Sequence, residues 1–119
     1  MDILVTNNPL VEAHFKGTFI VDFIDADLLG VLIHTRNMIH KGHRLLTHPL
    51  MGSVKPNESP YKSVLISGTN IIENTDVQSV AIIEECIITS QKFAPKNIPE
   101  KYLKDLQMVD LSLIQSATL

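Results

Sequence analysis

The chain changes from strand to helix within Ile3-Leu4-Val5-Thr6-Asn7-Asn8-Pro9, and this stretch determines the fold class. The apolar, partly β-branched run 3–6 is typical of a buried strand, and the polar residues after it mark its end. Pro9 suits the first turn of a helix, where its missing N–H is not needed, so we expect a short helix over residues 9–15. Residues 19–23 read as a second strand. A connection of about eleven residues is just long enough for the two strands to pair in parallel.

The next helix is predicted from apolar residues at helical spacing between Leu28 and Ile39, with Asp25 or Asp27 as its cap and Gly42 at its end. Residues 41–62 show no clean period and contain three prolines, which predicts a long loop. Loops of about 20 residues inside a compact domain are uncommon and often functional.

Residues 64–66 predict a third strand with residues 67–70 as its exit turn, and residues 76–93 predict a helix. The apolar run 80–83 within that helix could instead be a buried strand. A brief helix is expected from Pro99 to Leu106. Because Val109, Leu111 and Leu113 alternate with polar residues, a last strand is expected there. The chain, residues 1–119, is therefore expected to be a single α/β domain with a mostly parallel twisted sheet of about four strands and helices on its faces.

Composition and charge exclude several classes of protein. The 119 residues are 45% hydrophobic, which is too apolar for a disordered chain, and the net charge of −3 disfavours a nucleic-acid binder. We see no export signal and no apolar run near the roughly 20 residues that span a bilayer, so we expect no membrane contact. With a single cysteine, Cys86, and no disulfide, a cytoplasmic location is expected. Cys86 lies in an apolar helix and is expected to be a buried core residue.

Charge is unevenly distributed along the chain. Between Leu28 and Ile72 there are five cationic residues and one acidic residue, a net +4, so the remainder carries −7. This asymmetry predicts a basic patch around the long loop that would attract an anionic small molecule. The alternative is that these side chains only solvate an exposed loop.

Four of the five histidines lie within fifteen positions, at His34, His40, His43 and His48. No cysteine or acid of the segment completes a familiar ligand set, so we expect no metal. The chain also lacks the glycine-rich nucleotide-binding motifs and the nucleophile elbow of serine hydrolases. No cofactor and no catalytic residue are therefore predicted.

Two stretches carry a resemblance to a known family, residues 3–9 and the longer run 46–65, LTHPLMGSVKPNESPYKSVL. They resemble the GrdX family. The resemblance implies an association with the glycine, sarcosine or betaine reductase systems of amino-acid-fermenting anaerobes, in an accessory role. It supplies no catalytic assignment that could be transferred to a residue of this chain.

The candidate site is placed by position, because ligands of parallel α/β sheets gather beyond the carboxyl ends of the strands. There we expect the residues after the first strand, the Ser67-Gly68 turn and the long loop. We expect an accessory or regulatory protein whose loop 43–62 binds an anionic small molecule or a protein of the reductase complex. The alternative is a small enzyme that acts on a phosphorylated or carboxylated metabolite. The predicted ligand-binding residues are Asn7, Asn8, His48, Ser53, Lys55, Asn57, Tyr61 and Lys62.

Overall fold

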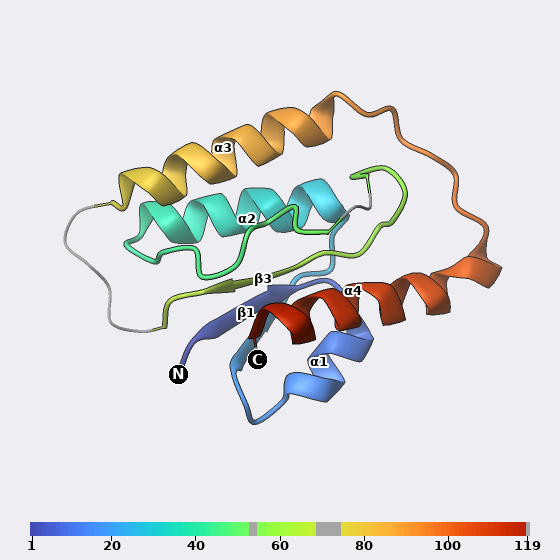
Figure 1. Ribbon diagram of the computed structural model, residues 1–119, viewed down its shortest axis with the longest axis horizontal. Helices are drawn as coiled ribbons and strands as arrows, with labels where there is room; N and C mark the ends of the chain where they lie inside the picture. Colours follow the sequence, from blue (N-terminus) through green and yellow to red (C-terminus); the bar gives the residue numbers. More distant parts are fainter. Residues whose placement is uncertain (53–54, 69–74, 119) are drawn as a thin grey trace.

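The computed structural model describes residues 1–52, 55–68 and 75–118 (Figure 1). Four helices, one short 3-10 helix and three strands occur in this part of the chain. In chain order they are β1 (Ile3–Thr6), α1 (Pro9–Phe15), β2 (Ile20–Phe23), α2 (Leu28–His40), β3 (Ser63–Ile66), α3 (Val77–Gln91), η1 (Glu100–Tyr102) and α4 (Leu103–Thr118).

The sheet has the strand order β2-β1-β3, with β1 in the centre. The β1 and β2 strands are parallel, with Ile3 opposite Ile20, which confirms the predicted crossover through α1. The β3 strand is antiparallel to β1, with Thr6 opposite Ser63. Within the described residues the sheet is thus mixed and three-stranded, and the prediction of a mostly parallel sheet of about four strands is wrong.

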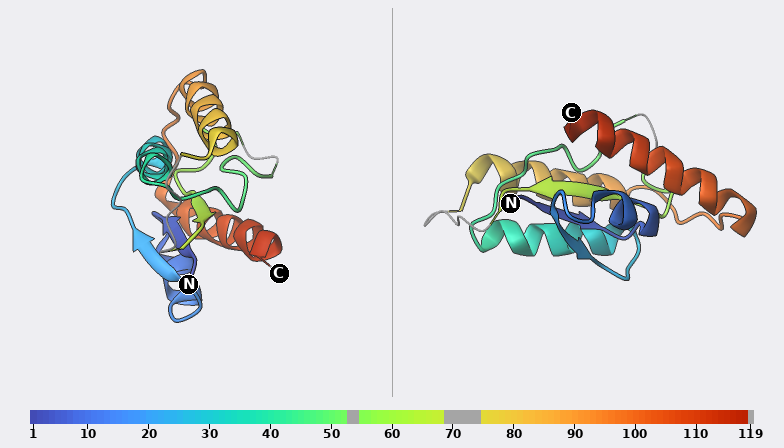
Figure 2. Two further views of the ribbon diagram at one scale, coloured as in Figure 1. Left: turned by 90° about the vertical axis from the view of Figure 1, so that its left-hand side faces the viewer. Right: turned by 90° about the horizontal axis from the view of Figure 1, so that it is seen from below.

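Helices cover both faces of this sheet (Figures 1 and 2). Alternate side chains of β1 point to opposite faces, as the period of a strand requires. Leu4 packs with Val11 of α1 and Ile114 of α4, whereas Val5 packs with Val31 of α2. The α3 helix lies along α2 and adds an outer apolar layer that includes Cys86, which confirms the cysteine as a core residue.

The predicted helix starts are confirmed by their caps. The Asn8 side chain accepts a hydrogen bond from the Leu10 N–H, and the Asp76 side chain accepts one from Ser79. Of the two candidates for α2, Asp27 is the cap and accepts from Gly30. No helix among the described residues is both long enough and apolar enough to cross a bilayer.

The predicted last strand is wrong, because Val109 and its neighbours lie within α4. The buried or half-buried positions Leu106, Asp110 and Ile114 are four residues apart, which is the spacing of one helix face. An alternation seen over only five residues is too short to exclude that spacing. The strand alternative for residues 80–83 is also wrong, because these residues lie inside α3.

Residues 41–62 form a loop, as predicted, and within its described part no helix or strand is present. The loop is nevertheless well packed. Leu45 forms an isolated antiparallel bridge with Ile66, and the Leu46 N–H donates to the Leu65 carbonyl. His43 and Lys62, near the two ends of the loop, are buried. The loop therefore runs back along β3 before it enters that strand.

Candidate functional site

A buried polar network joins the end of β1 to the start of β3 and to α4. The Thr6 and Ser63 hydroxyl groups are 2.7 Å apart, and the Ser63 hydroxyl donates to Asp110 Oδ2 at 2.8 Å. Asn8 Nδ2 donates to the same Asp110 oxygen at 3.1 Å. These four side chains are all buried. They satisfy one another, as buried polar groups must.

Asn7 connects three segments beside this network. Its Oδ1 accepts from the Lys62 N–H at 2.9 Å, while its Nδ2 donates to the carbonyls of Ala26 at 2.9 Å and Pro60 at 2.7 Å. Both N–H groups of the amide are therefore engaged by the protein. Asn7 positions the backbone that carries Lys62.

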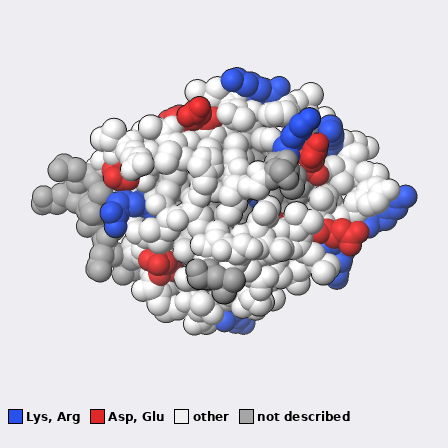
Figure 3. Space-filling view, viewed as in Figure 1, with Lys and Arg blue, Asp and Glu red and all other residues white. Residues whose placement is uncertain are grey.

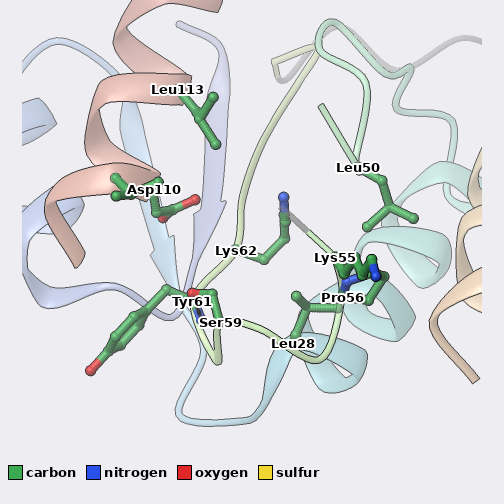
Figure 4. Close-up of a pocket in the computed structure, with 10 residues that line it drawn as sticks. Leu28, Leu50, Lys55, Pro56, Ser59, Tyr61, Lys62, Asp110 and Leu113 are labelled. Carbon is green, nitrogen blue, oxygen red and sulfur yellow. Dashed lines mark hydrogen bonds between the residues drawn. The ribbon is translucent and has the colours of Figure 1, made fainter. Parts of the chain in front are cut away.

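Lys62 is 7% exposed and its side chain points into a narrow pocket between the loop and α4 (Figure 4). Leu50 and Leu113 stand on either side of the ammonium group, and Asp110 lies beyond it. The cavity volume is about 20 Å³. About 10–15 Å³ is enough for one water molecule, so the enclosed part suits only a very small group.

The ammonium group of Lys62 makes no hydrogen bond or ion pair with the residues that the structure describes. Burial lowers the pKa of Lys62, and the charges of Asp110 and Cys86 oppose this effect without cancelling it. Burial also raises the pKa of the Cys86 thiol, with a further contribution from Glu85. The pocket thus contains a poorly solvated amine that is neutral more often than an exposed lysine.

The structure brings three of the predicted site residues together. Lys55 and Tyr61 line the same pocket as Lys62. Lys55 is exposed, and the Tyr61 ring points away from Lys62, where its hydroxyl accepts from Gln107 Nε2 at 2.9 Å (Figure 4). The predicted residue Ser53 lies outside the described residues.

Two other predicted residues lie apart from this pocket. His48 Nδ1 accepts from the Leu50 N–H at 3.1 Å, and His48 lines a separate hollow beside α3. Asn57 Nδ2 donates to the Ala94 carbonyl at 2.7 Å, and Asn57 lines a neighbouring pocket. The loop therefore does not present its polar side chains to one common space.

The comparison with known protein families covers nearly the whole chain. A family model described as GrdX-like protein matches residues 3–118, from β1 to the end of α4. The chain belongs to the GrdX-like family. No curated protein and no solved structure matches it. The family match confirms the resemblance seen in the sequence, and the family name gives only a hint of glycine reductase systems.

The sheet edge of this GrdX-like chain differs from the one expected. Because β3 is antiparallel, its carboxyl end does not lie beside Asn7 and Asn8. Gly68 instead lies against the backbone of Met1, at the amino end of β1. The grouping of the Ser67-Gly68 turn with the asparagines is therefore wrong, and Ser63 takes that place.

Asp110 is the residue of the GrdX-like site that sequence reasoning missed. It lies between Val109 and Leu111, in the run interpreted as a strand, where alternation would place it on the solvent side. The signal that could have found it is a carboxylate within a mostly apolar run, because a buried acid needs partners.

The predicted basic patch would need the cations of residues 28–72 to share one surface. Arg36 lies 3.7 Å from Glu84, and Lys62 is buried. On the face drawn in Figure 3, acidic and basic side chains are interspersed. This face therefore carries no broad basic patch.

The histidines are dispersed. His34 Nε2 lies 2.7 Å from Asp22, and His43 Nδ1 lies 2.9 Å from the Ser67 carbonyl. Within residues 1–52, 55–68 and 75–118, no group of three or more His, Cys, Asp or Glu side chains could hold a metal ion. The expectation that the protein holds no zinc stays a prediction.

Proposed function

We propose that this GrdX-like protein is a non-catalytic accessory protein of amino-acid reductase systems that binds a small anion at Lys62. The observation that carries the proposal is Lys62, a residue that is 7% exposed and whose ammonium group forms no hydrogen bond or ion pair with the other described residues. A buried charge is costly unless it is paired. An anion in the pocket would supply the missing partner.

The surroundings of Lys62 support an anionic ligand. Leu50 and Leu113 line the pocket with apolar side chains, and an electrostatic attraction is stronger in apolar surroundings than in water. Lys55 lines the pocket from an exposed position and adds a second cation. Because the enclosed volume is only about 20 Å³, it would admit one oxygen of a carboxylate or phosphate group, so the proposal is restricted to small anions such as acetate and inorganic phosphate whose other atoms lie outside it.

The link to reductase systems rests on the family name alone. A protein that binds a small carboxylate without changing it suits an accessory or regulatory role. We propose a protein of the reductase complex as the partner, with the 43–62 loop as the surface that it contacts.

The second candidate function is a small enzyme that acts on a carboxylated metabolite. The observation that favours it is the lowered pKa of Lys62, because a neutral amine is a nucleophile. Turnover of a bound ligand would distinguish this function from simple binding.

Titration calorimetry with acetate and with phosphate tests the binding site. Binding should be lost in Lys62→Met, which keeps the length of the side chain but removes its charge, and weakened in Lys55→Ala. The matched control is Lys104→Met, since Lys104 is exposed on α4 and does not line the pocket. Binding that is unchanged in Lys62→Met would refute the site.

A further inference from the structure

We propose that the Nζ amine of Lys62 forms an imine with the carbonyl carbon of a small aldehyde or 2-oxo acid that enters this pocket. The inference rests on the proposed function, because the same pocket would hold the carboxylate of the 2-oxo acid. It goes further by naming a covalent step and a class of ligand.

The geometry distinguishes Lys62 from every other lysine of the chain. Seven of the eight lysines are exposed, whereas Lys62 is 7% exposed and points into the pocket (Figure 4). Leu50 and Leu113 line the pocket beside the amine and make its surroundings partly apolar. Lysines that form Schiff bases are commonly activated by this kind of desolvation.

The reaction balances without any further reactant. The neutral amine attacks the carbonyl carbon, a C–N bond forms, and the electron pair of the C=O bond moves to oxygen, which is protonated. The resulting carbinolamine then loses water, which carries away the carbonyl oxygen and both amine hydrogens, and a C=N bond remains. No electrons enter or leave, so the step needs neither an oxidant nor a reductant.

Three ionisable groups from three different elements lie near enough to Lys62 to influence it or line its pocket. Asp110 lies on α4, Cys86 on α3 and Lys55 on the loop. Burial lowers the pKa of Lys62, which increases the fraction of neutral amine available for the attack. Asp110 is held in place by Asn8 and Ser63, and its negative charge favours the cationic form of the imine.

Reductive trapping with glyoxylate and cyanoborohydride at pH 7, followed by peptide mass mapping, tests the inference. Glyoxylate is the smallest 2-oxo acid, and reduction turns the imine into a stable secondary amine. Lys62 should be modified before any of the seven exposed lysines. Modification of exposed lysines at the same rate or faster would overturn the inference.

Two measurements on the wild-type protein separate this inference from the proposed anion site, with Lys62→Met as the variant that should lose both properties. The expected result is that the wild type is trapped at Lys62 and binds acetate, and that Lys62→Met does neither. If the wild type binds acetate and Lys62→Met does not, while wild-type Lys62 is never trapped, the imine is refuted and the anion site stands. If Lys62 is trapped but acetate does not bind, the anion site is refuted instead.

Discussion

Replacement of Asp110 by alanine should loosen the attachment of α4 to the sheet. Asp110 is 5% exposed, and its Oδ2 accepts from Ser63 Oγ at 2.8 Å and from Asn8 Nδ2 at 3.1 Å. These two bonds tie α4 to the start of β3 and to the residue that caps α1. Asp110→Ala removes both.

The expected loss in the free energy of unfolding depends on the hydrogen bonds that are lost and on those that remain. A hydrogen bond to a charged group contributes about 1.5–3 kcal/mol, and two are lost. Ser63 keeps its bond to Thr6, and Asn8 Nδ2 still donates one of its two N–H groups to the Gln107 carbonyl at 2.9 Å. The second N–H of Asn8 and one hydroxyl hydrogen lose their acceptor, so we expect the free energy of unfolding to decrease by about 3–6 kcal/mol.

Urea denaturation followed by far-ultraviolet circular dichroism measures this loss. Asp105→Ala is the matched control, because Asp105 is an exposed carboxylate in the first turn of the same helix. It should change the free energy of unfolding by no more than about 0.5 kcal/mol. If the two variants were equally stable, the buried network would not be the attachment of α4.

Three further predictions concern the core, the buried lysine and the histidines. In urea denaturation, Leu32→Ala should lower the free energy of unfolding by about 2–5 kcal/mol, whereas Tyr61→Phe should lower it by about 1 kcal/mol or less. Equal losses would show that the loop serves stability rather than binding. Because the pKa of Lys62 is lowered in the folded state, the unfolded state binds more protons at this residue at alkaline pH, so the free energy of unfolding of the wild type should rise relative to that of Lys62→Met as the pH approaches 10.5; a constant difference between the two proteins would contradict this. Protein purified without an affinity tag should hold no stoichiometric zinc by elemental analysis, and one zinc per chain, lost when His40 and His43 are both replaced, would refute that expectation.

Elements with a strong local signal could be predicted from the sequence. The α2 helix has both apolar periodicity and a cap, Asp27, and it occurs where expected. The direction of β3 has no local signal, because its three apolar positions, 64–66, suit either direction. It depends on the path of the preceding loop. Since Leu45 pairs with Ile66, the loop covers the length of the sheet before the chain turns, and β3 must then run against β1.

The candidate site could be predicted only in part, because the sequence does not show which of its charged side chains are buried. A count of cations along the chain treats Lys55 and Lys62 alike, although one is exposed and the other is buried. Burial of Lys62 depends on α4, which contributes Leu113 and Asp110 to the pocket. With residues 109–113 interpreted as a strand, no helix was available to cover the lysine.

The two stretches that carry the family resemblance are in contact, and this contact positions the lysine. Asn7, from the first stretch, bonds to the Lys62 N–H and to the Pro60 carbonyl of the second. A side-chain amide can bond in this way to a donor and an acceptor two residues apart, and it thereby fixes the local course of the backbone. Because that course decides where the Lys62 side chain points, the buried amine and the asparagine belong to one structural unit. The hydrogen bonds of the Asn7 side chain thus go to the backbone around Lys62, and its role in binding a ligand stays a prediction.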